Sequence, residues 1–371
     1  MRCGVKLVSH IQTDIVAGVG MITLNRPEAL NALTLQMVNH LSSVLSGWIE
    51  NPEVDIVAIR GNSKQGNFGA FCAGGDIRAL HHAAINNDPA VEDFFNVEYS
   101  LNHLVYSYPK PVIAFMDGVV MGGGMGLSQG ADLRIVSERT RMAMPETKIG
   151  LFTDAGGGYF LSRCPGASGE YLALTGQMLI GGDALTLGLA DAIAPSETLP
   201  ELWNSLTENL QLSPTERLEQ LQKQLTKTAQ EPQWLDRQID AIFSLPTLME
   251  IIQALENANN HWARETLKII RQRSPLMLHV SLEHIRRGRS LCIADDLRLE
   301  RILVQHCFKT QHLGRSGSSS ETVEGIRALA VDKDQNPKWN PARIEDITPE
   351  MVDPFFISPW PDSQHPLANL K

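Results

Sequence analysis

The stretch PVIAFMDGVVMGGGMGLSQGADLRIV, from Pro111 to Val136, contains the pattern that decides the fold class. Its apolar ends predict two strands, and between them lie a glycine triplet at residues 122–124 and a short helical sequence. Strands and helices alternate in this order in βαβ units. The stretch therefore predicts a mixed α/β architecture.

The rest of the N-terminal half continues this alternation. Two short β-rich runs between Val5 and Leu24 are separated by AGVG and predict a hairpin. Thr34 is a suitable N-cap for a helix whose apolar residues recur at steps of three or four. Residues 55–61, DIVAIRG, predict a further strand that leads into a loop.

The character of the sequence changes after about residue 195. Residues 216–242, 248–270 and 276–310 have a helical pattern almost throughout. We therefore expect an α/β core over residues 1–195 and a mainly helical region over residues 196–371.

Charge and composition disfavour several classes of function. The net charge of −10 argues against extensive electrostatic binding of nucleic acid. The sequence has no run of eighteen consecutive apolar residues, which argues against a membrane span. The five cysteines form no CxxC pair, which favours a reducing compartment. The first residues lack the apolar run of a secretory signal, although a processed precursor would look the same. We expect a cytoplasmic protein without nucleic-acid or membrane partners.

Two glycine-rich loops are candidates for binding a ligand through the backbone. FCAGGDIR, residues 71–78, ends near a predicted helix start, and MGGGMG, residues 121–126, lies between a strand and a helix. Helix starts leave N–H groups unpaired, and two of them from different loops can hold one developing oxyanion. The alternative is that the glycines only allow strand and helix to pack tightly. The loops lack the GxxxxGK[ST] and GxGxxG patterns, which disfavours nucleotide phosphates.

Neither a metal nor a cofactor is expected. The eleven histidines form no HExxH or other short-spaced ligand set. Residues 332–336, DKDQN, begin like an EF-hand loop, but Pro337 stands at the glycine position and Arg343 at the bidentate glutamate position. Cys72 adjoins the first glycine loop, yet no nearby histidine shows a recognised pairing with it, so a thiol nucleophile is disfavoured.

The combination of motifs between about Ile22 and Asp191 resembles the crotonase (enoyl-CoA hydratase/isomerase) family. The matching stretches, in the family's order and spacing, are ITLNRPEALNAL, FCAGGDI, PVIAFMDGVVMGGGMGLSQGADLRIV, MPETKIGLFTDAGGGYFLSR and ALTGQMLIGGDALTLGLAD. This resemblance implies a spiral of ββα repeats with a helical C-terminal region. It also implies a coenzyme A thioester as substrate and no separate cofactor.

The resemblance also assigns binding groups residue by residue. The two amides of the oxyanion hole fall on Gly75 and Gly123. Residues 28–30 and 73–77 fall where the family holds the adenosine and pantetheine parts of coenzyme A. The substrate-binding residues expected there are Leu30, Ala73, Asp76 and Ile77.

The acids distinguish the reactions within this family. Hydratases of this kind use two glutamates to position one water, and the corresponding positions here are Gly126 and Glu146. Because glycine cannot polarise water, two-carboxylate hydration is disfavoured. Glu146 together with Asp154 remains a chemically capable pair of acids.

The stretch MPETKIGLFTDAGGGYFL resembles the 3-hydroxyisobutyryl-CoA hydrolase branch, and residues 274–288 and 324–341 resemble its C-terminal part. The branch implies hydrolysis of 3-hydroxyisobutyryl-CoA to 3-hydroxyisobutyrate and coenzyme A, a step of valine breakdown. It implies Glu146 and Asp154 as catalytic acids and Glu98 near the substrate. Glu146 acts either as a general base or as a nucleophile, and both routes stay open. Thr153 departs from the branch, which commonly has proline there.

Each of these residues also has a simpler interpretation when it is considered alone. Glu146 is typical of a surface acid after a proline, Asp154 of a helix N-cap, and Glu98 of a solvated helix face. Residues 284–289, HIRRGR, are typical of a solvated helix end, with contact to a coenzyme A phosphate as the alternative.

Two other functions compete with thioester hydrolysis. One is hydration or double-bond isomerisation, with an acid elsewhere compensating for Gly126. The other is acyl-CoA binding without catalysis, although binding alone needs neither Glu146 nor Asp154. The family implies a homo-oligomer, a trimer or a hexamer, whereas the helical region can instead fold back on its own core.

Overall fold

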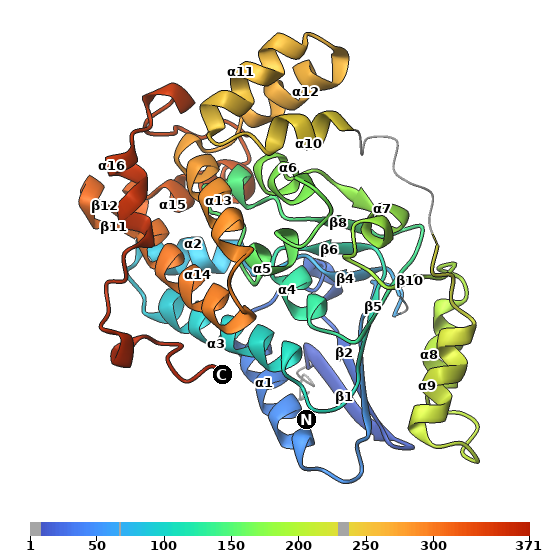
Figure 1. Ribbon diagram of the computed structural model, residues 1–371. Coiled ribbons are helices and arrows are strands. Elements are labelled where there is room, and N and C mark those ends of the chain that lie inside the picture. Colours follow the sequence, from blue (N-terminus) through green and yellow to red (C-terminus); the bar gives the residue numbers. More distant parts are fainter. Residues whose placement is uncertain (1–8, 67, 229–236) are drawn as a thin grey trace.

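Two β-sheets form the framework of the computed structural model, which describes residues 9–66, 68–228 and 237–371 (Figure 1). The six-stranded sheet has the order β1 (Ile11–Val16), β2 (Val19–Leu24), β3 (Ile56–Gly61), β5 (Val112–Met116), β7 (Leu133–Val136), β10 (Ala192–Ile193). The four-stranded sheet has the order β4 (Ala70–Cys72), β6 (Val119–Met121), β8 (Arg141–Ala143), β9 (Leu179–Ile180). Neighbouring strands are parallel except in the pairs β1–β2 and β8–β9.

The chain winds as a spiral of ββα repeats, as the sequence predicts. Consecutive strands enter different sheets, in the pairs β3 and β4, β5 and β6, and β7 and β8. After β4 and β6, helices return the chain to the first sheet, whereas after β8 the chain reaches β9 of the second sheet. The helices of the first turns are α1 (Leu35–Ile49), α2 (Ile77–Ile85), α3 (Ala90–Tyr106) and α4 (Gly123–Gln129). Because successive turns stack, loops that are far apart in the sequence meet at one place.

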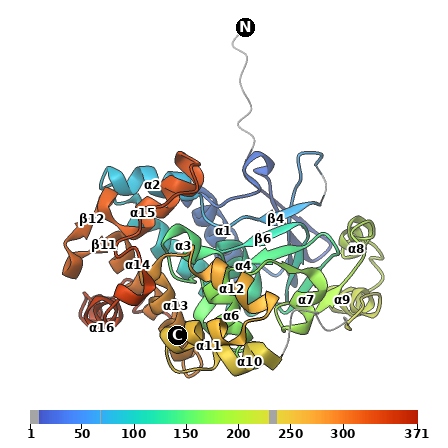
Figure 2. The ribbon, with the colours of Figure 1, turned by 90° about the horizontal axis from the view of Figure 1, so that it is seen from above.

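Both faces of the six-stranded sheet are buried except at the edge strand β1, and the alternation of side chains explains how. In β3, Val57 and Ile59 belong to the larger hydrophobic cluster, while Ile56 and Ala58 belong to the smaller one. The smaller cluster is completed by α8 (Leu199–Ser205) and α9 (Pro214–Lys223). These two helices lie on the side of the molecule opposite to α14 (Ile293–Phe308) and α16 (Pro349–Val352) (Figure 2).

The first local predictions are confirmed. Thr34 caps α1, because its side chain accepts a hydrogen bond from the Met37 N–H group at 3.2 Å. The AGVG turn joins β1 to β2, with Ala17 and Gly18 at positive φ angles of 53° and 84°. Of the predicted hairpin, residues 5–8 lie outside the described residues.

Short helices dominate the remainder of the chain. They are α5 (Gly157–Leu161), α6 (Ser168–Thr175), α7 (Gly181–Thr186), α10 (Arg237–Phe243), α11 (Leu248–Ala258), α12 (His261–Ile270), α13 (Pro275–Gly288), α14 (Ile293–Phe308), α15 (Glu321–Ile326) and α16 (Pro349–Val352), with the short strands β11 (Lys309–Thr310) and β12 (Arg315–Ser316). Two of the long helical segments are therefore pairs of helices. Asn259, at a φ of 44°, ends α11, and Asn260 caps α12. The segment 216–242 crosses residues 229–236, which lie outside the described part.

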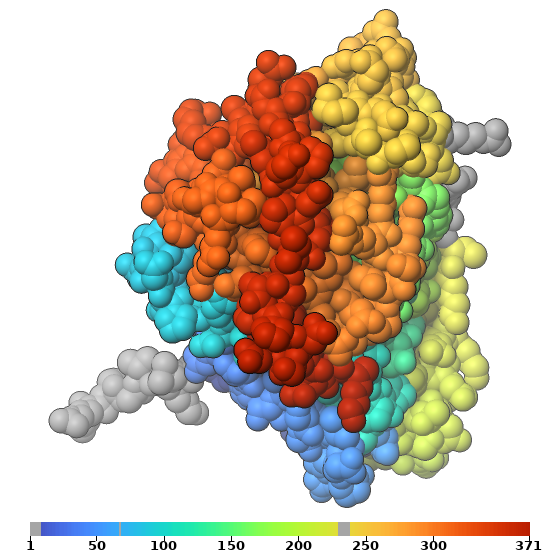
Figure 3. Space-filling view, turned by 60° about the vertical axis from the view of Figure 1, so that its left-hand side comes forward, coloured from blue at the N-terminus to red at the C-terminus, as the bar shows by residue number. Residues whose placement is uncertain are grey.

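The helical region packs back on the α/β part. The larger hydrophobic cluster contains Val57 and Met116 from the sheet together with Leu282 and Leu297 from α13 and α14. The end of the chain runs as a band over α14, where Arg298 Nε donates to the Leu367 carbonyl at 3.2 Å (Figure 3). Through this shared core, α13 and α14 pack against the α/β part, while the domain boundary at residue 195 stays a prediction. Within the described residues, no helix is both long and apolar enough to cross a membrane.

Candidate active site

A cavity of about 200 Å³ lies where the loops after β4 and β6 meet α3 and the segment that precedes α5. Seven predicted site residues line it: Gly75, Gly123, Glu146, Asp154, Glu98, Ala73 and Ile77. The rest of its wall is mainly apolar and includes Leu80, Phe94, Phe95, Ile149, Leu151 and Leu329. The small polar interior in an apolar wall is typical of a ligand site.

Two predicted binding residues, Leu30 and Asp76, do not line this cavity. Leu30 is 47% exposed and has a φ of 51°. Its carbonyl accepts a hydrogen bond from the Ala73 N–H group at 3.0 Å, so the two predicted coenzyme A loops are joined. The Asp76 side chain caps α2 by accepting from the Ala79 N–H group at 3.2 Å, and it forms an ion pair with Arg26 at 2.8 Å.

Gly75 and Gly123 come from the two glycine loops and line one cavity. A Cβ added to Gly123 would lie 3.6 Å from the Gly75 nitrogen, so the loops are adjacent. Gly74 and Gly122 adopt positive φ angles of 92° and 49°, which turn the following N–H groups away from their strands. Neither amide donates a hydrogen bond to another described residue. Two unpaired amides on adjacent loops are the kind of donors that an oxyanion hole requires, and that role stays a prediction.

Three buried carboxyl groups, those of Glu98, Glu146 and Asp154, converge on the same cavity. Glu146 Oε1 is 3.0 Å from the position of a Cβ added to Gly122, and a Cβ added to Gly123 would overlap Glu98 Oε1. Among the described residues, Glu98 Oε1 and Glu146 Oε2 have no hydrogen-bond partner. These atoms are therefore available to a ligand.

Among the described residues, one hydroxyl group holds the Asp154 side chain in place. Tyr99 Oη donates a hydrogen bond of 2.8 Å to Asp154 Oδ2. The interpretation of Asp154 as a helix N-cap is wrong, because α5 begins at Gly157 with Gly156 as its N-cap and without a side-chain cap bond. The carboxyl group instead points toward α3 and the cavity.

The simpler interpretations of the other two acids are also wrong. Glu146 is 5% exposed and does not lie on the surface. Glu98 is 3% exposed and does not belong to a solvated helix face. Both acids lie next to glycine backbone, which leaves room for a carboxyl group in an otherwise apolar wall.

Burial raises the pKa of all three acids, and repulsion by neighbouring carboxyl groups adds to the rise at Glu146 and Glu98. Burial raises the pKa of Glu146 well above its usual range, and the charges of Asp154 and Glu98 add to this. Burial and the Asp154 charge likewise raise the pKa of Glu98. The pKa of Asp154 rises to about 6 through burial, while the bond from Tyr99 opposes the rise. Protonated and ionised carboxyl groups can thus coexist in one site, as acid–base catalysis requires.

Glu98→Gln should increase stability, and the gain should grow from pH 5 to pH 8. A raised pKa means that the folded protein holds the Glu98 proton more tightly than the unfolded chain does. That contribution is fully present below the unfolded pKa and is lost as pH rises through the folded pKa. We therefore expect the stability gain of the variant to be larger at pH 8 than at pH 5. Thermal melts at both pH values measure it, with the exposed Glu53→Gln as control; a constant difference between the two pH values contradicts the prediction.

Gly126 marks the position of the acid that two-glutamate hydratases would carry. A Cβ added there would lie 2.8 Å from both Cβ and the carbonyl oxygen of Ala155, and 2.8 Å from Asn102 Nδ2. Helix α4 therefore packs directly on the turn that follows Asp154. A residue larger than glycine at position 126 would therefore force this turn to move.

Cys72 does not have the environment of a nucleophilic thiol. Burial raises its pKa to about 12. Its Sγ atom donates to the Asn31 carbonyl at 3.3 Å and is fully buried. The thiol therefore stays protonated, as expected for a small buried residue.

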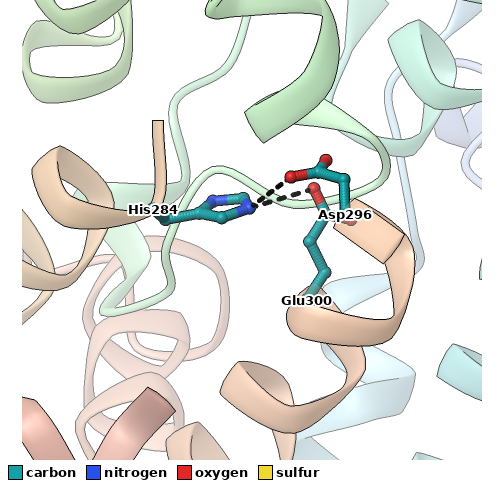
Figure 4. Close-up of side chains that lie close together, drawn as sticks. All are labelled: His284, Asp296 and Glu300. Carbon is teal, nitrogen blue, oxygen red and sulfur yellow. Dashed lines mark hydrogen bonds and ion pairs between the residues drawn. The ribbon is translucent and has the colours of Figure 1, made fainter. Parts of the chain in front are cut away.

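The structure adds three buried residues that the sequence interpretation missed: His284, Asp296 and Glu300 (Figure 4). Their ligand-type atoms lie within 4.8 Å of one another. Asp296 and Glu300 are four residues apart on α14, so they share one face of that helix. The signal that could have identified Asp296 and Glu300 from the sequence is their position on the buried face of an amphipathic helix. The interpretation of residue 284 as part of a solvated helix end is wrong, because His284 is 0% exposed.

Comparisons with known proteins agree with this architecture. Residues 19–356 match the family model described as Enoyl-CoA hydratase/isomerase. A Xenopus tropicalis protein named 3-hydroxyisobutyryl-CoA hydrolase, mitochondrial, is 40% identical over 91% of this chain and 86% of its own. A carnitinyl-CoA dehydratase structure from Mycobacterium thermoresistibile is 33% identical, with a TM-score of 0.86 over 98% of this chain and 100% of its own. An enoyl-CoA hydratase structure from Rhodobacter sphaeroides is 37% identical, with a TM-score of 0.80 over 95% and 98%.

Proposed function

Because this chain belongs to the enoyl-CoA hydratase/isomerase family, we propose that it hydrolyses the thioester of a short branched 3-hydroxyacyl-CoA, 3-hydroxyisobutyryl-CoA in particular. The observation that carries the proposal is the convergence of Glu146 and Asp154 on the cavity that Gly75 and Gly123 also line. The products are 3-hydroxyisobutyrate and coenzyme A, which makes the reaction a step of valine breakdown. The relative named 3-hydroxyisobutyryl-CoA hydrolase, which matches 91% of the chain, supports the choice of substrate.

In the proposed mechanism the thioester oxygen occupies the oxyanion hole. The N–H groups of Gly75 and Gly123 stabilise the negative charge that develops there, and each donor contributes about 3 kcal/mol in comparable acyl-transfer enzymes. Glu146 either removes a proton from the attacking water or attacks the carbonyl carbon itself. In the second route, water then opens the mixed anhydride. In both routes the C–S bond breaks and the thiolate of coenzyme A leaves.

In this proposal Asp154 either transfers protons or orients the acyl group. Its pKa of about 6 lies close to physiological pH, where a group exchanges protons most effectively. It can protonate the leaving thiolate or accept the substrate's 3-hydroxyl group in a hydrogen bond. Glu98 lies next to the Gly123 backbone and, like Asp154, lines the cavity that is proposed to hold the acyl group.

The coenzyme A part of the substrate is proposed to lie along the joined loops at Leu30 and at Ala73–Ile77. The hydrogen bond between Ala73 and Leu30 and the ion pair between Asp76 and Arg26 hold these loops together. Exposed Leu30 offers an apolar surface at the outer end, and Ile77 lies at the cavity wall. The reaction needs no cofactor beyond the coenzyme A of the substrate.

Hydration or isomerisation of an enoyl-CoA is the second candidate, and one observation favours it. Glu98 and Asp154 place additional acids beside Glu146, which is the compensation that this reaction requires. The names of the two similar structures, a dehydratase and a hydratase, point in the same direction. A purely acyl-CoA-binding role is less well supported, because three buried acids cost stability that binding alone does not require.

Parallel assays with three substrates separate these functions. We expect release of free thiol from 3-hydroxyisobutyryl-CoA and from 3-hydroxypropionyl-CoA, and no loss of enoyl absorbance with crotonyl-CoA. Loss of enoyl absorbance without thiol release would support hydration. No reaction in any assay would rule out both enzymatic proposals and leave binding alone.

Compartment and assembly are proposed separately from the reaction. The described thiols Cys72, Cys164, Cys292 and Cys307 are free, which supports a reducing environment. We propose the cytoplasm, and cell fractionation distinguishes it from the mitochondrial location in the name of the Xenopus tropicalis relative. Light scattering measures whether the chain forms the trimer or hexamer that the family implies.

A further inference from the structure

The second glycine triplet, residues 156–158, contacts a buried acid–histidine cluster formed by His284 on α13 and by Asp296 and Glu300 on α14. All three side chains are 0% exposed. Figure 4 shows the imidazole directed at both carboxyl groups, which project from neighbouring turns of α14. The cluster does not line the cavity, so the mechanism above assigns it no role.

The two carboxyl groups bind the backbone of the triplet. Glu300 Oε2 accepts a hydrogen bond from the Gly156 N–H group at 2.8 Å, and Oε1 accepts one from Gly158 at 3.3 Å. Asp296 Oδ2 accepts one from the Tyr159 N–H group at 2.8 Å. These three amides, at a turn and at a helix start, are otherwise without intrahelical partners. The carboxyl groups thus hold the segment from Gly156 to Tyr159 in one position.

The held segment follows Asp154 directly. Ala155 and Gly156 have positive φ angles of 57° and 86°, and the Gly157 N–H group donates to the Asp154 carbonyl at 2.9 Å. A positive φ is unfavourable for alanine and persists only where surrounding contacts impose it. The bonds to Glu300 and Asp296 are contacts of this kind. The position of the Asp154 carboxyl group therefore depends on α14.

His284 completes the cluster through a hydrogen bond to Asp296 and a longer contact with Glu300. Its Nε2 atom lies 3.2 Å from Asp296 Oδ1 and 3.7 Å from Glu300 Oε1, and both oxygens are acceptors, so Nε2 carries the hydrogen. A Cβ added to Gly158 would overlap both His284 Nε2 and Asp296 Oδ1. Close packing of the imidazole on the glycine backbone thus fixes where the carboxyl groups lie.

A histidine with two carboxyl groups also resembles a set of metal ligands. In this cluster, however, each carboxylate oxygen already faces an N–H donor. Asp296 receives hydrogen bonds from Tyr159 and His284, and Glu300 receives them from Gly156 and Gly158. A cation would have to displace these donors from the turn. The contacts therefore favour a role in holding the backbone.

We propose that His284, Asp296 and Glu300 are positioning residues that hold the Ala155–Gly156 turn, and through it Asp154, in the geometry needed for turnover. This inference rests on the proposed hydrolysis of an acyl-CoA. None of the three residues touches the reacting atoms. They act through the backbone amides of the turn.

Glu300→Gln tests the inference, with Glu283→Gln on the exposed face of α13 as the matched control. Glutamine keeps the size of the side chain but replaces one acceptor oxygen by an NH2 group, which donates. One amide of the triplet then loses its hydrogen-bond acceptor. We expect kcat to fall about 10- to 100-fold, the cost of a displaced catalytic group, while KM changes less than about twofold. Amide hydrogen exchange at Gly156 and Gly158 should become faster in this variant.

A second pair of variants keeps the test decisive if Glu300→Gln does not fold. His284→Gln retains an N–H donor and should keep most of the wild-type kcat, whereas His284→Met removes the donor and should lower kcat about tenfold or more. Equal kcat values for these two variants would overturn the proposal.

Three further outcomes would also overturn it. The first is a Glu300→Gln enzyme as active as Glu283→Gln, and the second is unchanged amide exchange at the triplet. The third is a wild-type enzyme that loses turnover with a chelator and regains it with Zn²⁺ or Mn²⁺, which would indicate a metal site. A wild-type protein that releases no thiol from any substrate refutes the proposed function instead, and amide exchange then still decides whether Glu300 holds the turn.

Discussion

Replacement of Glu146 by glutamine should reduce kcat for 3-hydroxyisobutyryl-CoA by at least about a thousandfold, because the amide can neither accept a proton from water nor attack the thioester. Glu146 is buried in the cavity wall beside the Gly122 backbone. Glutamine has nearly the same size, so the cavity should keep its shape. Affinity for a non-hydrolysable acyl-CoA, measured by calorimetry, should change less than about threefold.

The exposed Glu53→Gln variant controls for the substitution itself and should retain wild-type turnover. Near-wild-type activity of Glu146→Gln would remove Glu146 from the mechanism. The wild-type enzyme also allows the two routes to be separated. A hydroxamate found on Glu146 after trapping with hydroxylamine indicates the covalent route.

Gly126→Ala should lower kcat for thiol release about a hundredfold, a cost typical of displacing a catalytic group by about 1 Å. The new Cβ would lie 2.8 Å from Ala155 Cβ and from the Ala155 carbonyl oxygen, which is closer than van der Waals contact. The turn that carries Asp154 must shift to admit it. Gly126→Glu should lose at least as much activity and should gain no hydration of crotonyl-CoA, because its carboxyl group cannot enter without displacing Asp154.

Gly47→Ala in α1 is the matched control, because no atom lies within 4 Å of its added Cβ. This variant should keep full activity and gain about 0.5–1 kcal/mol of stability from the better helix propensity of alanine. Hydration of crotonyl-CoA by Gly126→Glu would instead show that position 126 accepts a catalytic acid. In that event, the distinction between hydrolase and hydratase drawn from this glycine is incorrect.

The elements of the fold were predictable where local pattern and packing agree. The β5 strand is a continuous apolar run because it is buried on both faces, and Thr34 is both a favourable cap and an observed one. The breaks inside the long helical segments were missed. The apolar spacing continues across residues 248–270, so the pattern predicts one helix, while Asn259 and Asn260 end one and begin another. A single asparagine is too weak a signal to outweigh such spacing.

The candidate site was predictable to the extent that short motifs specify it. The glycine loops and the MPETKIGLFTDAGGGYFL stretch identify the residues that the structure brings together around one cavity, including Gly75, Gly123, Glu146 and Asp154. Their catalytic roles stay predictions. The His284–Asp296–Glu300 cluster was not predicted, because its partners are up to 144 residues away and no local pattern encodes contacts at that distance. Burial of polar groups depends on tertiary packing, which an isolated motif does not specify.

The separation of 144 residues between Gly156 and Glu300 has a consequence for the newly synthesised chain. At about 5–20 residues per second, the ribosome needs roughly 7–30 s to proceed from one to the other. During that interval the nascent protein already contains both proposed catalytic acids but lacks the groups that hold the turn after Asp154. On the proposed role of the cluster, activity begins only after residue 300 has been made and α14 has docked. On the same proposal, a chain released before residue 300 contains both acids but has no activity.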